Sequence, residues 1–443
     1  MLHAISPIDG RYAAQTHGLQ ACFSEMALMR YRILVEVEYL IALVETGIIR
    51  EHPLNHNQKT LLRNFVASFH ENDALRIKSI EAKINHDVKA IEYYIREKLD
   101  GIGLGALKEW VHFGLTSQDI NNSAFPLMIR EAYVKYIMPE MESVRELIRQ
   151  FAEKTENIPM LAHTHGQPAS PTRFGKEMLV FVERMDMQLA QLEAVELKVK
   201  FGGATGNFNA HAAAFPGINW IEWADLFTGH YLHIKRYRYT TQIEHYDQLA
   251  ALCHSTMRIN TILVDFCRDI WTYISMHYIT QKANPDEVGS SAMPHKVNPI
   301  DFENAEGNLG YANAVFGHLA DKLPVSRLQR DLTDSTVLRN IGVPVAHTFL
   351  ALNSIRKGMK KIEVNASQML KDLDSNWAVL AEAIQTILRR EGVEQPYELL
   401  KGLTRGKEQV TREDLHAFIA QLKITESVKE ELMRLRPEGY LGV

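Results

Sequence analysis

The length, composition and charge of the chain already exclude several classes of protein. Its 443 residues are too many for one ordinary domain, so we expect two or three. Apolar residues make up 46% and charged residues 23%, a balance typical of a globular protein. The net charge of −5 argues against a broad nucleic-acid-binding face. No apolar run approaches the roughly 18 residues of a membrane span. With three cysteines, no CxxC pair and no signal-peptide pattern, we expect a cytoplasmic protein without disulfides.

Helical patterns dominate the N-terminal third. Ser24 is a good N-cap for a helix running to Gly47, and a second helix is expected at about 57–69. Strand-like alternation bounded by turn residues is scarce here and throughout the chain. We therefore expect an N-terminal helical domain over residues 1–111.

Longer helices are expected in the middle of the chain. From Met178 to Val199 the apolar residues advance by three or four positions, an apolar seam typical of bundled helices, and Gly202-Gly203 can end that helix. Residues 231–284 contain neither Gly nor Pro, so another long helix can run there. Residues 299–322 and 335–361 offer two more. Long helices without crossover strands predict a central antiparallel bundle, which we place at residues 112–364.

The last part of the chain is expected to form a small helical domain over residues 365–443. Thr411-Arg-Glu-Asp414 in it resembles a capping box, with Asp in place of the usual Glu. The predicted fold class is therefore all-α, with three helical domains.

The most specific pattern lies in residues 289–299, GSSAMPHKVNP. Asn298 is a good N-cap and Pro299 suits a first helical position, so a loop is expected to end in a helix start here. The N–H groups of that start, together with Lys296, make a candidate carboxylate site. The segment matches every fixed position of GSSxMPxKxNP, the signature of the fumarase/aspartase superfamily, which the chain therefore resembles.

That resemblance implies a reaction class. Enzymes of the superfamily remove a proton from the carbon next to a carboxylate and expel a group from the adjoining carbon, which leaves fumarate or an analogue. Such chemistry needs a base, a cradle for the extra negative charge and an acid for the leaving group. By the match, Ser290 is the base and Lys296 and Asn298 hold the carboxylate. Ser291 and Met293 are further substrate contacts of the same loop.

Residues 163–169, HTHGQPA, could supply either a metal pair or a catalytic acid. No thiolate or carboxylate lies at ligand spacing nearby, so no metal is expected. Histidine can donate a proton near neutral pH, and Gly166 with Pro168 indicates a fixed turn that would aim the His165 ring. The string THGQPA resembles a motif of the adenylosuccinate lyase family, in which the histidine matching His165 protonates the departing purine amine. His163 has no such role and is expected to be structural.

Two further motifs resemble that family and narrow the substrate. Residues 85–90, NHDVKA, resemble its HDVxA motif, which implies that Asn85, His86 and Asp87 line the nucleotide and succinyl site. Residues 112–119, HFGLTSQD, resemble its H-x-G-x-T-S-x-D motif. The hydroxyls of Thr116 and Ser117 would then bind a succinyl carboxylate, and His112 is a further substrate contact. Many family members carry Glu or Thr where this chain has Gln118, a change that we expect to be tolerated.

Recognition of a phosphate needs cations that a plain dicarboxylate lyase lacks. Ser335 and Arg339 are one helical turn apart on the same face, so with a helix N-terminus near Ser335 they make a candidate phosphate site. The family match assigns nucleotide contacts to Arg11, Tyr12, Arg330, Ser335 and Arg339. Gln242 and Asn304 complete the matched contacts.

The resemblance, carried by motifs between residues 9 and 339, also implies activity and assembly. The expected reactions split fumarate from adenylosuccinate, giving AMP, and from the succinylated aminoimidazole carboxamide ribotide, giving AICAR, in purine biosynthesis and without a cofactor. In that family four chains form one superbundle and three chains contribute to each site. We therefore expect a homotetramer with shared sites, a small nucleotide substrate, and no nucleic-acid or membrane partner. The resemblance is to the bacterial branch of the family. One departure is that the sequence stops at Gly442-Val443, sooner than those relatives.

Three other interpretations stay open. Carboxymuconate cycloisomerase shares the MPHK form of the loop, but its family lacks the NHDVKA and phosphate-site strings. Argininosuccinate lyase shares the loop but typically has Gln at the position of His295. A structural relative without activity, like the lens crystallins of the superfamily, is disfavoured because Ser290, His165, His86 and Lys296 are all present.

Overall fold

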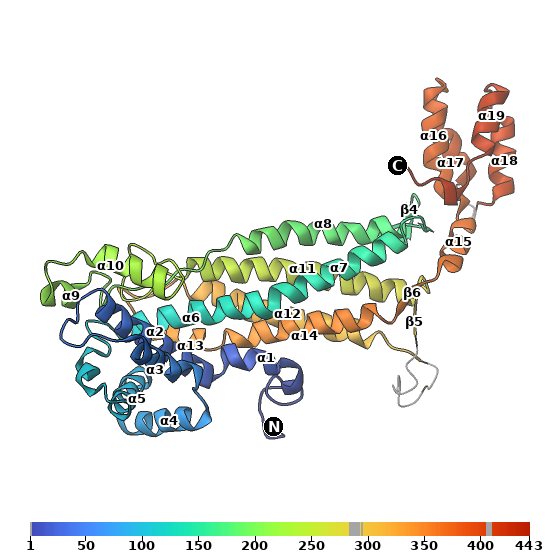
Figure 1. Ribbon diagram of the computed structural model, residues 1–443. Helices are drawn as coiled ribbons and strands as arrows, with labels where there is room; N and C mark the ends of the chain where they lie inside the picture. The colour runs from blue at the N-terminus through green and yellow to red at the C-terminus, as the bar shows by residue number, and fades with distance from the viewer. Residues whose placement is uncertain (1, 283–292, 294–295, 405–409) are drawn as a thin grey trace. The chain divides into compact units, whose positions relative to one another are not determined.

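The computed structural model describes residues 2–282, 293, 296–404 and 410–443, which are overwhelmingly helical (Figure 1). Within this part, strands of two or three residues pair into three two-stranded antiparallel sheets. The chain divides into two compact units. The first unit holds residues 1–141, 188–261 and 307–352, and the second holds residues 142–187, 262–306 and 353–443. The predicted all-α class is confirmed.

The N-terminal helices of the first unit pack around α2 (Glu25–Glu45). Ser24 caps α2 as predicted, since its Oγ accepts from the N–H of Ala27 at 3.0 Å. Nearly all of α2 is buried, including the charged residues Arg32, Glu36 and Glu38. The helices packed against it include α1 (Ala13–Phe23), α3 (His56–Ala67), α4 (Glu71–Ile84), α5 (Asp87–Gly101) and α6 (Ser117–Ala132), and the 3-10 helix η1 (Gly105–Trp110) packs against α5.

Five long helices form the predicted antiparallel bundle: α7 (Met138–Lys154), α8 (Phe174–Glu193), α11 (Asp247–Ser275), α12 (Ile300–Lys322) and α14 (Gly342–Met359). Each of them is divided between the two units. In the first unit, the amide of Asn260 on α11 donates to Asn313 on α12 and to Thr348 on α14, both at 3.0 Å. In the second unit, Arg184 on α8 pairs with Asp265 on α11 at 2.6 Å. The bundle is therefore confirmed within each unit.

Several predicted helix limits are wrong, because tertiary contacts override local propensity. The helix expected from 231 begins only at Asp247. Residues 232–246 are irregular, and Val199 and Arg236 form a parallel bridge there. For the same reason α8 ends at Glu193, short of Val199. The helix expected at 335–361 is two helices, α13 (Thr333–Leu338) and α14. The helix predicted to be capped by Asn298 begins at Ile300, with the Pro299 carbonyl accepting its first bonds.

The remaining short elements of the first unit surround these irregular segments. They are α9 (Asn209–Ala214), α10 (Trp220–Leu226) and the π-helical turns η2 (Tyr133–Ile137) and η3 (Phe227–Tyr231). The strands found in the described residues all belong to the second unit: β1 (Pro159–Met160), β2 (His163–Thr164), β3 (Gln167–Pro168), β4 (Thr172–Arg173), β5 (Ile279–Gln281) and β6 (Ile362–Val364).

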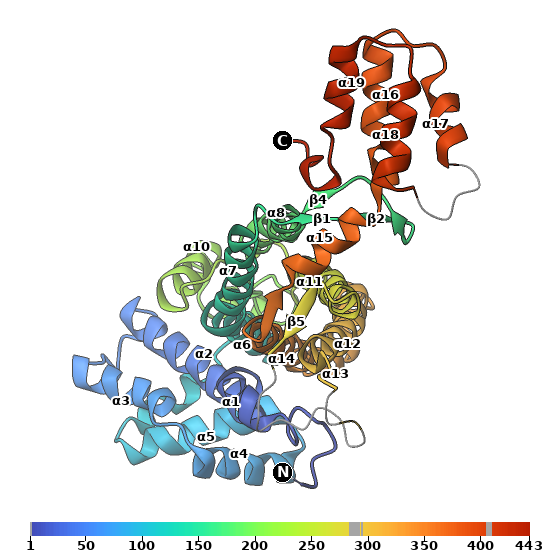
Figure 2. The ribbon, with the colours of Figure 1, turned by 90° about the vertical axis from the view of Figure 1, so that its right-hand side faces the viewer.

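The C-terminal helices of the second unit enclose an apolar core of their own, which includes Trp377, Ile384 and Leu415. They are α15 (Ala366–Asp374), η4 (Trp377–Leu380), α16 (Ala381–Arg390), α17 (Pro396–Thr404), α18 (Arg412–Gln421), α19 (Glu426–Met433) and η5 (Pro437–Gly439), and Figure 2 shows α16, α18 and α19 side by side. The predicted capping box is present, since Thr411 Oγ1 accepts from the N–H of Asp414 at 3.2 Å. None of the helices in the described residues is long and apolar enough to cross a membrane.

Candidate active site

The start of α6 organises the predicted site residues of the first unit. Thr116 is the residue before the helix, and its N–H donates to Asp119 Oδ2 at 2.8 Å. Ser117 is the first helical residue and is half-buried. The unpaired N–H groups of a helix start attract anions. The geometry is therefore suited to the predicted role of Thr116 and Ser117 as carboxylate ligands.

Asp119 anchors this helix start to a glycine-containing loop. Its Oδ1 accepts from the N–H groups of Gly202 and Gly203 at 2.8 and 3.0 Å. The ammonium group of Lys200 lies 2.7 Å from the same oxygen, and both side chains have 0% exposure. Burial lowers the pKa of Lys200, and Asp119 opposes that shift. This ion pair fixes the Thr116–Ser117 turn against the loop that follows α8.

Arg330 lies beside the same helix start and donates to two neutral oxygens. Its Nη1 donates to Gln242 Oε1 and its Nη2 to Ser335 Oγ, both at 3.2 Å. Gln118 approaches the guanidinium as well. Within the described part of the chain, Arg330 forms no ion pair with a carboxylate. The predicted nucleotide contacts Gln242, Arg330 and Ser335 are thus brought together by hydrogen bonds to one guanidinium.

Asp87 bridges two arginine side chains. Its Oδ2 lies 2.7 Å from Nη2 of Arg32 and 2.6 Å from Nη2 of Arg339. Burial by itself would raise the pKa of Asp87, but the two guanidinium groups outweigh it and hold that pKa below its usual range. Arg32 is 3% exposed and also donates to Asn121 on α6 at 2.9 Å. Two predicted site residues, Asp87 and Arg339, therefore contact each other directly.

His112 pairs with a buried carboxylate of α2. Its Nδ1 lies 2.5 Å from Glu36 Oε1, and its N–H donates to Glu36 Oε2 at 3.2 Å. Burial disfavours the charged ring, but Glu36 outweighs it, with smaller contributions from Glu92 and Asp119, so the pKa of His112 is raised. A protonated ring here would carry positive charge to the site. This fits a predicted contact to an anionic substrate.

The other predicted residues of the first unit lie on exposed connections. Asn85 ends α4 in a left-handed conformation with φ +53°, and His86 caps α5, its Nδ1 accepting from the N–H of Lys89 at 3.1 Å. Arg11 and Tyr12 precede α1, and the Arg11 guanidinium lies 6.0 Å from the Tyr12 ring centre. A cavity of about 380 Å³ lies between α1 and the start of α14, and Asp9 and Arg339 line it.

His165 belongs to the second unit, at the tip of a hairpin. Strands β2 and β3 pair Thr164 with Gln167, which leaves His165 and Gly166 as a two-residue loop. Both have positive φ, +53° and +73°, as a type I′ turn requires. The predicted fixed turn is present, and it exposes the ring. A left-handed φ is uncommon for residues other than glycine, and the site residues Asn85, His112 and His165 all have one.

The rest of the predicted site falls in or next to residues 289–299. Ser290 and Ser291 lie outside the described residues. Met293 and Lys296 are exposed, and Asn298 is half-buried just before α12. Asn304, one turn into α12, accepts from Ser354 Oγ of α14 at 2.8 Å. These residues all belong to the second unit.

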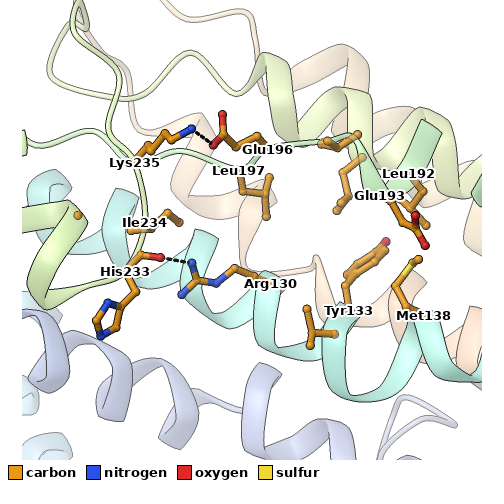
Figure 3. Close-up of a pocket in the computed structure, with 14 residues that line it drawn as sticks. Arg130, Tyr133, Met138, Leu192, Glu193, Glu196, Leu197, His233, Ile234 and Lys235 are labelled. Carbon is orange, nitrogen blue, oxygen red and sulfur yellow. Dashed lines mark hydrogen bonds and ion pairs between the residues drawn. The ribbon is translucent and has the colours of Figure 1, made fainter. Parts of the chain in front are cut away.

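Figure 3 shows a cavity of the first unit that none of the predicted site residues lines. Its volume is about 820 Å³, and η2 and η3 both contribute to its wall. At its edge Arg130 donates to the carbonyl of His233 at 2.5 Å, and Lys235 pairs with Glu196 at 2.7 Å. In the residues that the structure describes, no group of three or more His, Cys, Asp or Glu side chains could hold a metal ion.

Comparison with known proteins gives two family models that together span most of the chain. A lyase model matches residues 10–317, and a model of the adenylosuccinate lyase C-terminal region matches residues 326–441. The chain is 54% identical to the adenylosuccinate lyase of Dictyostelium discoideum, 49% to that of Vibrio cholerae and 48% to that of Escherichia coli K12. Each alignment covers 100% of this chain and 97% of the relative. The chain belongs to the adenylosuccinate lyase family.

Solved structures of more distant lyases share the fold. The 3-carboxy-cis,cis-muconate lactonizing enzyme of Pseudomonas putida superposes with a TM-score of 0.77 at 20% identity, covering 96% of this chain and 94% of that one. A fumarate lyase of Mesorhizobium sp. BNC1 gives 0.79 at 18% identity, covering 96% and 95%. At such identities these two structures establish the fold alone. Membership of the adenylosuccinate lyase family makes the chain a lyase.

The family motifs did not reveal several buried residues that position the site. Arg32 and Glu36 hold the predicted residues Asp87 and His112 from α2. Lys200 pairs with Asp119 behind the α6 turn. One signal was available for the first two, since the charges at 32 and 36 stand four positions apart in a largely apolar helix and so share one face. Charged residues are almost never buried unless they are paired, so both should have been assigned partners.

Proposed function

We propose that the chain splits adenylosuccinate into AMP and fumarate, and the succinylated aminoimidazole carboxamide ribotide into AICAR and fumarate. The observation that carries this proposal is the arrangement around the start of α6. A helix start suited to a carboxylate lies next to Arg330, a half-buried cation held only by neutral oxygens. Within the described residues Arg330 forms no ion pair, so its guanidinium is available to bind an anionic group of a ligand. A succinylated nucleotide carries both carboxylates and a phosphate.

The proposed chemistry is an elimination. The alkoxide of Ser290 takes the proton from the succinyl carbon next to a carboxylate, and the electrons of that C–H bond form the carbon–carbon double bond of fumarate. The C–N bond breaks with its electron pair going to the purine amine, and His165 gives that nitrogen a proton. Thr116, Ser117, protonated His112, Lys296 and Asn298 would stabilise the negative charge that develops on the carboxylate. No cofactor is needed for the electron balance.

We further propose a homotetramer with shared sites, located in the cytoplasm. Large exposed apolar side chains on three bundle helices support it, because another subunit could bury them. Met187 on α8 is 59% exposed, Trp271 on α11 47% and Tyr311 on α12 55%. The three-domain division at 111 and 364 also remains a proposal. The three cysteines are free and buried, as a reducing compartment permits.

The assay that tests this function follows the ultraviolet change of purified protein with adenylosuccinate, together with the fumarate formed. We expect one fumarate per AMP. Ser290→Ala and His165→Ala should each lower turnover by roughly 10² to 10⁴-fold, because each removes one proton-transfer group. Turnover of argininosuccinate or carboxymuconate without any of adenylosuccinate would show a different lyase of the superfamily. Full activity of Ser290→Ala would remove that residue as the base.

A further inference from the structure

Gln118 is the residue of the TSQD segment to which neither the motif nor the proposed chemistry gives a role. It lies on the second position of α6, and its side chain is buried at 1% exposure. Its amide contacts residues within the segment 330–339, which carries predicted nucleotide contacts and lies more than two hundred positions along the chain. This stretch is called the nucleotide segment. One end of the amide lies 3.4 Å from Ser335 Oγ and 3.4 Å from Asp334 Oδ2. Gln118 therefore faces the nucleotide segment and not solvent.

The same end of the amide also faces Arg330. A guanidinium only donates hydrogen bonds, so we assign the amide oxygen to the end that faces it, although the same end lies 3.4 Å from Asp334 Oδ2. In that orientation Gln118 Oε1 accepts from Nη2 of Arg330 at 2.8 Å and from Nε at 3.2 Å. These two bonds hold the guanidinium plane at two points. Because Gln242 and Ser335 hold the other edge, Arg330 is fixed by three neutral acceptors.

Gln118 supplies Arg330 with a neutral acceptor. A carboxylate at this position would also accept from Arg330, but it would add a negative charge. It would also lie beside Asp334, which accepts from the hydroxyl of Tyr246 at 2.9 Å and is 3% exposed. An apolar side chain would leave one edge of Arg330 without an acceptor. Glutamine orients the cation without neutralising it.

We propose that Gln118 is a positioning residue that presents Arg330 and Ser335 to the 5′-phosphate of the nucleotide. The proposal rests on the proposed function, since it assigns Arg330 to that phosphate. Under this proposal α6 has two functions. Its start at Thr116 and Ser117 binds a succinyl carboxylate, and Gln118 on the same helix orients the phosphate-binding Arg330. The two ends of the substrate would then be held in register by one rigid element, as a reaction that requires exact placement demands.

The test compares how strongly AMP and adenosine inhibit the full-length enzyme, because only AMP carries the phosphate. In Gln118→Met the affinity for AMP should fall roughly tenfold while that for adenosine stays within about twofold, as loss of one oriented charged hydrogen-bonding partner predicts. The KM for adenylosuccinate should rise by a similar factor, and kcat should change less. Gln118→Glu keeps an acceptor toward Arg330, so it should retain the affinity for AMP better than Gln118→Met does.

Ser123→Ala is the matched control. Ser123 has 0% exposure on the same helix and donates to the Asp119 carbonyl at 2.7 Å, and among the described residues it forms no hydrogen bond with residues 330–335. It should leave the AMP-to-adenosine ratio unchanged. If Gln118→Met changes both affinities equally, or only lowers the thermal unfolding midpoint, Gln118 is structural and the proposal is wrong. Arg330→Met tests the phosphate-binding role of Arg330 separately from the positioning role of Gln118. An unchanged AMP affinity in that variant would overturn the phosphate assignment itself.

Discussion

Two buried charged residues on α2 determine the orientation and charge state of the site residues that they contact. Arg32 shares the Asp87 carboxylate with Arg339, and Glu36 holds the ring and N–H of His112. A charge-assisted hydrogen bond is about twice as strong as a neutral one, so these contacts fix both rotamer and charge state. The chemistry proposed for the exposed residues therefore depends on side chains that do not touch the substrate.

At this scale we predict the effect of Glu36→Gln, which keeps the shape and removes the charge. The pKa of His112 is raised mainly by Glu36, against the effect of burial, so it should fall in the variant. In the native chain the stability from this pair is present below the unfolded histidine pKa and is lost as the pH rises through the raised folded pKa. In the variant, protonated His112 should disappear at lower pH. The KM for adenylosuccinate should then rise roughly tenfold near pH 7.5.

The measurement is an NMR titration of the His112 ring together with KM from pH 6 to 9. Glu38→Gln is the matched control, because Glu38 is also buried on α2 but pairs with Arg63 at 2.7 Å. It should leave both quantities unchanged. An unaltered His112 titration in Glu36→Gln would show that Glu36 does not set the charge of the ring.

At the scale of elements, sequence patterns located helices better than they located the segments between them. Ser24 and Thr411 correctly predicted where α2 and α18 begin, because a capping side chain acts within one turn of the helix. The region after Tyr231 contains no helix breaker, yet it is irregular up to Tyr246. Here Glu244 and Tyr246 join a buried polar network with Asn122, and no local pattern encodes a partner more than a hundred residues away.

The ion pair between Asp119 on α6 and Lys200 in the loop at 200–203 leads to a prediction at the scale of elements. Asp119→Asn should destabilise the first unit by about 3–5 kcal/mol, because it leaves the buried Lys200 cation without its partner. Burial lowers the pKa of that amine, and without Asp119 it should fall further. The unfolded chain then binds more protons than the folded one, so the variant should gain stability as the pH rises toward the ordinary lysine pKa.

Chemical unfolding from pH 6 to 10 measures this effect. Lys200→Met should cost less, because Asp119 keeps three backbone N–H donors. The double variant Asp119→Asn/Lys200→Met should be more stable than the sum of the single losses predicts. Additive losses without pH dependence would show that the two side chains contribute independently.

At the scale of the whole molecule, the predicted site is divided between residues of the two compact units. The first unit carries the nucleotide and carboxylate contacts, while His165 and the residues from Met293 to Asn304 belong to the second. His165 is exposed on its hairpin. Sequence motifs identify these residues one by one, but they do not say which chain of an assembly supplies each. Exposed Met187, Trp271 and Tyr311 on the bundle helices support an assembly of several copies.

Mixing two inactive variants tests whether acid and base come from different chains. Ser290→Ala protein keeps His165, and His165→Ala protein keeps Ser290. If each site draws these residues from different chains, equal mixing with free subunit exchange should give both intact groups to about a quarter of the sites. Activity should therefore return to about a quarter of the native value although each parent is nearly inactive. Co-purification of differently tagged variants verifies the exchange. If exchange is complete and the mixture stays as inactive as its parents, acid and base come from one chain.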